Sequence, residues 1–101
     1  MKLTSDELKI VREILNKCIP RYAVWAFGSR VHGRLLKQFS DLDLVIITEQ
    51  PLPTNIHQDL ADAFSNSDLP FKVDILDWAR IEQNFREKIL LEYEIIQTAD
   101  I

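Results

Sequence analysis

The stretch from Phe27 to Ile47, FGSRVHGRLLKQFSDLDLVII, decides how this chain folds, because it holds a Gly-Ser pair and two aspartates between apolar segments. The run of aliphatic residues that follows Asp43 predicts a strand. On a strand, residues i and i+2 point to the same face, so Asp41 and Asp43 project together, about 7 Å apart. Two like charges at the head of the most apolar strand oppose burial, and their presence there calls for an explanation.

A divalent cation would remove this conflict between the two carboxylates. Hard oxygen ligands suit Mg²⁺, which binds one or two carboxylates together with substrate phosphates. The alternative is structural: Asp41 caps a turn and Asp43 lies on an exposed strand edge. An isolated pair of this kind favours the structural interpretation, so further residues must decide.

A third aspartate, Asp74, lies within the apolar segment FKVDIL. An unpaired carboxylate in such a strand is costly, which favours a bound partner or metal. If this strand neighbours the first pair of aspartates, Asp74 completes a triad. Asp77 is a rival, but its offset of three residues puts it on the opposite strand face, where we interpret it as a helix cap.

The Gly28-Ser29 pair follows an apolar strand and precedes a possible helical turn. Glycine permits the close approach of a phosphate, and backbone N–H groups at such a turn suit an anion. Arg30 comes next and either contacts phosphates or is a solvated turn residue. The sequence leaves these two interpretations of Arg30 open.

Composition limits the class of protein. The 101 residues, 47% hydrophobic and 28% charged, predict a single domain over residues 1–101 with a real core. A net charge of -4 disfavours a nucleic-acid surface, and the lone cysteine excludes an internal disulfide. The first ten residues lack the apolar core of a signal peptide and no stretch suits a membrane span, so we expect a cytoplasmic protein.

The hydrophobic pattern predicts alternating helices and strands. Strands alternating with helices are typical of an α/β sandwich, here with about three strands flanked by helices. The directions of the strands stay open. The expected elements are a helix from a capping box at residues 4–7 to about residue 17, a strand at 22–27, a helical turn at 29–33, a loop at 34–40, a strand at 41–47, a helix at 55–67, a strand at 71–76 and a final helix at 78–96.

The combination of these motifs resembles the nucleotidyltransferase superfamily typified by DNA polymerase β. It is most similar to the minimal nucleotidyltransferases (MNT proteins) of HEPN–MNT toxin–antitoxin pairs. The segments that carry the resemblance are FGSRVHG, SDLDLVI and VDILD, within residues 24–78. The resemblance implies a palm-like α+β fold with a small mixed sheet.

The resemblance also implies roles for individual residues. Gly28 and Ser29 are expected to bind the nucleotide triphosphate, with Arg30 as a further nucleotide-binding candidate. The expected catalytic and metal-binding residues are Asp41, Asp43 and Asp74, which would hold two Mg²⁺ ions, with ATP as the substrate.

The function implied is transfer of AMP from ATP to a hydroxyl, in this family often a tyrosine of a HEPN toxin, with the MNT protein as antitoxin. The alternatives are nucleotide transfer to a small molecule such as an aminoglycoside, and a binding module that neutralises its partner by contact. A glycosyltransferase-like use of the aspartate pair would need a larger domain.

The C-terminal segment is unusually apolar for a surface helix. One helical stripe buries only part of it, so the rest is expected to meet a protein partner or a second copy of the chain. The apolar residues concerned are Ile89, Leu90, Leu91, Tyr93, Ile95 and Ile96.

Overall fold

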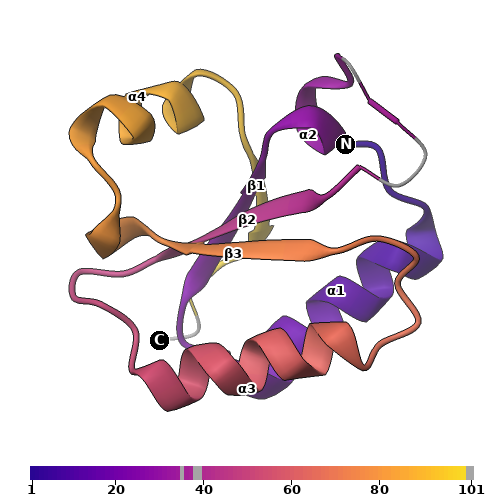
Figure 1. Ribbon diagram of the computed structural model, residues 1–101, viewed down its shortest axis with the longest axis horizontal. Coiled ribbons are helices and arrows are strands. Elements are labelled where there is room, and N and C mark those ends of the chain that lie inside the picture. The colour runs from indigo at the N-terminus through magenta and orange to yellow at the C-terminus, as the bar shows by residue number, and fades with distance from the viewer. Residues whose placement is uncertain (35, 38–39, 100–101) are drawn as a thin grey trace.

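In the computed structural model, which describes residues 1–34, 36–37 and 40–99, helices and strands alternate along the chain (Figure 1). Positions 35, 38 and 39 of the predicted loop at 34–40 lie outside the described residues. The elements are α1 (Ser5–Cys18), β1 (Ala23–Phe27), α2 (Ser29–His32), β2 (Leu42–Ile47), α3 (Thr54–Ser65), β3 (Val73–Asp77), a 3-10 helix η1 (Trp78–Arg80), α4 (Gln83–Leu91) and β4 (Glu94–Gln97).

The four strands form one mixed sheet in the order β3-β2-β1-β4. β1 is antiparallel to both β2 and β4, whereas β2 and β3 are parallel. The parallel pair requires a crossover, and α3 supplies it. The prediction of a small mixed sheet is confirmed, with one strand more than expected.

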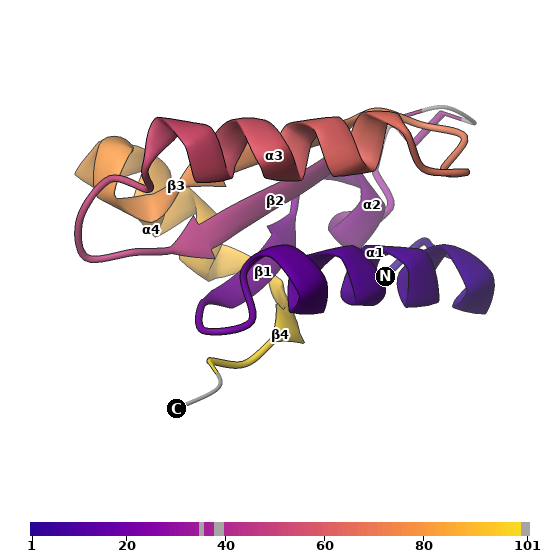
Figure 2. The same cartoon turned by 90° about the horizontal axis from the view of Figure 1, so that it is seen from below.

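The helices lie on both faces of the sheet. Figure 1 shows α1 and α3 below the strands and α2 and α4 above them, and Figure 2 shows α1 and α3 side by side. The main core lies between the sheet and the first pair of helices. It is built around Val11, Leu15, Val24, Ala26, Leu42, Leu44, Ile46, Leu60, Phe64 and Ile96.

Local sequence explains where α1 and β2 begin. The Thr4 hydroxyl accepts a hydrogen bond from the Glu7 backbone N–H, and the Glu7 carboxylate accepts one from the Thr4 backbone N–H. This is the capping box expected for α1. In β2, Leu42 and Leu44 point into the main core, and Asp43 points to the opposite face.

Within the described residues, no helix has the length and apolarity needed to cross a membrane.

The predicted final helix at 78–96 is wrong at both ends. Its start is the 3-10 helix η1, and α4 begins only at Gln83. α4 ends at Leu91, and the residues from Glu94 to Gln97 form β4 instead. The edge of β1 is free to pair, and β4 fills it, with Trp25 opposite Ile95. Tyr93 stacks on Trp25 with ring centroids 4.4 Å apart, which fixes the entry into β4.

Candidate functional site

Two of the predicted site carboxylates lie side by side. In the parallel pairing of β2 with β3, Asp43 is the register partner of Asp74. Residues opposite each other on neighbouring strands share a face, so both side chains leave the sheet on the side away from α1 and α3. Asp41 lies just before β2 and is exposed. The condition that the strand of Asp74 neighbours the strand of Asp43 is therefore met.

The surroundings of Asp43 disfavour its charged form. The pKa of Asp43 is raised from 3.8 to about 6, mainly by burial and further by the negative charges of Asp74 and then Asp41. A positive ion placed among these groups would reverse both effects, because it would replace lost hydration and cancel like-charge repulsion. The electrostatics of the site therefore suit a cation.

Gly28 lies against the Asp43 carboxylate. Its φ of 80° is in the left-handed region, which favours glycine. A Cβ at this position would lie 3.2 Å from Asp43 Cγ and closer still to Asp43 Oδ2. The absence of a side chain therefore leaves the backbone of the Gly-Ser turn directly beside the acidic residues, and α2 begins at Ser29.

The carboxylates do not form a closed set of metal ligands as they stand. In the part of the chain that the structure describes, no three acidic, histidine or cysteine side chains lie close enough together to hold an ion. The Lys72 ammonium lies 3.4 Å from Asp74 Oδ1, and this pair is exposed, with 73% and 39% of the side chains accessible. Exposed pairs of this kind are worth at most about 1 kcal/mol, so Asp74 can turn toward Asp43 at little cost. Carboxylate oxygens are ligands of the kind that Mg²⁺ prefers.

Arg30 does not lie where a phosphate ligand was expected. Its side chain is buried, and the guanidinium donates to the carbonyl oxygens of Ser40 and Lys2, each at 2.8 Å. The same group lies 3.9 Å from the ring centroid of Phe71. The solvated-turn interpretation is wrong, and this geometry favours support of the segment before Asp41 over a direct phosphate contact.

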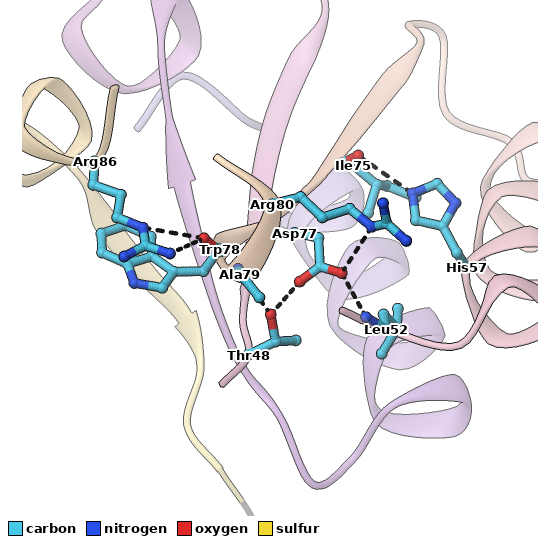
Figure 3. A network of polar contacts seen from close by, with 9 residues as sticks. All are labelled: Thr48, Leu52, His57, Ile75, Asp77, Trp78, Ala79, Arg80 and Arg86. Atoms are coloured by element: carbon cyan, nitrogen blue, oxygen red, sulfur yellow. Dashed lines mark hydrogen bonds and ion pairs between the residues drawn. The ribbon is translucent and has the colours of Figure 1, made fainter. Parts of the chain in front are cut away.

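Asp77 is not the side-chain helix cap that the sequence predicts. It precedes η1, but its carboxylate makes no capping hydrogen bond. Instead the buried carboxylate accepts hydrogen bonds from Thr48 Oγ1 and, at 2.5 Å, from the Leu52 backbone (Figure 3). Arg80 Nε lies 3.8 Å from the same carboxylate. The prediction that Asp77 faces away from Asp74 holds, since Asp77 joins β3 to the connection after β2.

The approach of α4 to the site was missed at the sequence level. Phe27, the β1 residue opposite Asp43, contacts the Phe85 ring at a centroid distance of 5.9 Å. Lys88 and Leu91 line a cavity on the same side. No local pattern in α4 signals this contact, because it depends on where the helix packs.

Comparison with known proteins adds a family to this geometry. The family model described as "Nucleotidyltransferase domain" matches residues 8–96. A relative from Haemophilus influenzae, named "Probable protein adenylyltransferase MntA", is 52% identical over 97 residues, which cover 96% of this chain and 84% of the relative.

Solved structures share the fold at lower identity. A toxin–antitoxin complex with AMP-PNP matches with a TM-score of 0.73 and 19% identity over 92% of this chain and 74% of the matched chain. A structure of tri-AMPylated Shewanella oneidensis HEPN toxin in complex with MNT antitoxin matches with a TM-score of 0.63 and 16% identity, over 91% and 73% of the two chains.

Proposed function

Because this chain belongs to the nucleotidyltransferase domain family, we propose that it transfers AMP from ATP to a hydroxyl group of a partner protein. The observation that carries this proposal is the placement of Asp43 opposite Asp74, with the side-chain-free Gly28 directly against Asp43. This arrangement sets acidic groups beside a backbone turn that a phosphate can approach. The name of the relative at 52% identity, a probable protein adenylyltransferase, supports protein as the acceptor class.

Each site residue has a proposed role. Gly28 and Ser29 receive the triphosphate, with the Ser29 hydroxyl as an additional donor. Asp41, Asp43 and Asp74 would hold two Mg²⁺ ions, and these would supply positive charge to the attacking and leaving oxygens. The raised pKa of Asp43 supports this assignment, because a site that disfavours its own negative charge without a cation favours binding one.

The proposed reaction is a single displacement at the α-phosphorus. The acceptor oxygen forms a bond to the α-phosphorus, and the bond from that atom to the bridging oxygen breaks. Pyrophosphate leaves with the electron pair, and the hydroxyl proton passes to Asp74. Asp74 suits this role because it lies on β3, the edge strand of the sheet, where a second protein can reach it.

We further propose that the acceptor is a tyrosine of a HEPN toxin and that the chain acts as its antitoxin in the cytoplasm, where ATP is available. The toxin–antitoxin structures with the same fold support this partner class. In one of them the HEPN toxin is described as tri-AMPylated and its partner as an MNT antitoxin.

Intact-mass measurement of a co-expressed HEPN-domain partner tests the proposal. The expected result is a mass gain of one or more AMP groups with the natural chain and none with Asp43→Asn. Tight complex formation without any mass gain would contradict catalysis and favour neutralisation by contact. Transfer to an aminoglycoside but not to the partner would contradict the protein acceptor.

A further inference from the structure

A groove of about 250 Å³ opens beside Gly28, between α2 and α4. Its lining includes Phe27 and Gly28, Phe85 and Leu91 of α4, and Arg34 and Lys88. Phe27 is the register partner of Asp43, so this lining residue lies one strand away from the acidic residues. The groove therefore adjoins the candidate catalytic site.

The α4 wall of the groove is apolar and exposed. Leu91 is 86% and Phe85 42% accessible, and every exposed large hydrophobic residue found in the described part of the chain lies between positions 85 and 95. The helix itself is held firmly, because Ile89 is buried and Arg86 donates twice to the Trp78 carbonyl (Figure 3). Apolar side chains fixed in an exposed position beside a reactive site are typical of an interaction surface.

The size of this surface favours a protein over a nucleotide. Leu91 lines the groove but is 86% accessible, so most of its side chain projects beyond the cavity of about 250 Å³. A polypeptide that crosses the groove covers Leu91 and Phe85 together. Burial of both side chains thus requires an occupant that extends beyond the cavity.

The charges at the groove define the occupant further. Arg34 pairs with Glu92 at 3.3 Å, whereas Lys88 has no ion-pair partner among the described residues. In a chain of net charge -4, this leaves a local cation free to meet an acidic group. The groove therefore suits a segment that combines an apolar side chain with an acidic one.

We propose that the groove between α2 and α4 is the docking site of the acceptor protein, which seats an apolar, acidic segment on Phe85, Leu91 and Lys88. This inference rests on the proposed function, because the docked segment brings the acceptor hydroxyl to the acidic residues. Docking here gives α4 a specific role: it selects the protein that is modified.

The test compares Leu91→Glu with Leu90→Glu, a matched control on the same helix whose side chain does not line the groove. The probe is the co-expressed HEPN-domain partner, and its affinity is measured alongside the affinity of each variant for AMP-PNP with Mg²⁺. Leu91→Glu should weaken partner binding at least about tenfold, as expected for an interface anchor, and leave nucleotide affinity unchanged. Leu90→Glu should alter neither quantity, and Lys88→Glu should weaken partner binding alone.

Partner binding that survives Leu91→Glu would overturn the proposal, and so would equal weakening by both leucine variants. A loss of nucleotide affinity in Leu91→Glu or Lys88→Glu would also overturn it, by assigning the groove to the nucleotide. The proposed function fails by a different result, namely no AMP on the partner with the natural chain. Partner binding that still depended on Leu91 in that case would support docking at the groove.

Discussion

Replacement of Asp43 by asparagine is expected to stabilise the metal-free protein while it abolishes nucleotide transfer. The change keeps the shape of the side chain but removes a charge that burial and the neighbouring Asp74 and Asp41 carboxylates disfavour. Most substitutions of a half-buried strand residue destabilise, so an increase in stability would be specific to this electrostatic cost.

The expected magnitude follows from the pKa of Asp43. A rise from 3.8 to about 6 corresponds to about 3 kcal/mol, since each whole step in pKa is worth about 1.4 kcal/mol. Asp43 is only partly buried, and solvent screening reduces the effective cost to about 1 kcal/mol. For a domain of this size, about 1 kcal/mol changes the melting temperature by roughly 4–8 °C.

The pH dependence has a definite sign. Between about pH 4 and pH 6 the folded protein holds a proton on Asp43 that the unfolded chain releases, so the natural protein loses stability as the pH rises through this window. Above the window the full cost is present, and below it the carboxyl is neutral in both states. The advantage of Asp43→Asn should therefore be complete at pH 7.5 and absent below about pH 4.

Thermal melts of both proteins with a chelator present, at pH 7.5 and near pH 4, measure this difference. Asp59→Asn, on the exposed face of α3, is the matched control. Its melting temperature should equal that of the natural protein at both pH values. A melting temperature of Asp43→Asn at or below that of the natural protein at pH 7.5 would refute the electrostatic account of the site.

Four further variants test other parts of the site. Asp74→Asn should lower the rate of transfer at least about a hundredfold without lowering the melting temperature, because it also removes a charge beside Asp43. Asp77→Asn should instead cost about 1–3 kcal/mol of stability and retain activity, because Asp77 serves a buried hydrogen-bond network. An Asp77→Asn variant that is fully stable but transfers no AMP would contradict this assignment and give Asp77 the role proposed for Asp74. Gly28→Ala should weaken binding of AMP-PNP with Mg²⁺ in a titration, because φ is 80° and the added Cβ meets the Asp43 carboxylate; unchanged affinity would show that the turn does not need to approach the ligand. Arg30→Lys should lower kcat and leave KM for ATP nearly unchanged, since a single ammonium cannot hold both backbone carbonyls, and a raised KM with normal kcat would point to a phosphate contact instead.

Local patterns were sufficient to predict the elements that carry the aspartates. The two-residue period of β2 predicts that Asp43 points to the face opposite that of the core residues Leu42 and Leu44, and the structure confirms this. The position of Asp74 beside Asp43 could be expected only on the condition that β2 and β3 are neighbours. That pairing is decided by the crossover through α3, which no short segment encodes.

The errors have a common physical origin in tertiary contacts. The segment after Leu91 fits both a helix and a short strand, and the open edge of β1 decides for β4. Arg30 follows the Gly-Ser turn in sequence, but its side chain is buried. It donates hydrogen bonds to the carbonyl oxygens of Ser40 and Lys2 and lies over the Phe71 ring. Both outcomes depend on residues distant in the chain, which sequence periodicity does not register.

The parallel pairing of β2 with β3 has a consequence for the order in which the protein acquires its activity during synthesis. Asp41 and Asp43 emerge early, but the opposing carboxylate cannot join them until α3 and β3 have been made and the crossover has closed. The wall that α4 contributes beside Gly28 comes later still. A growing chain therefore passes through lengths at which Asp41 and Asp43 exist without Asp74 beside them. If the proposed function holds, truncated products of translation that end before β3 should not transfer AMP, whatever their helical content.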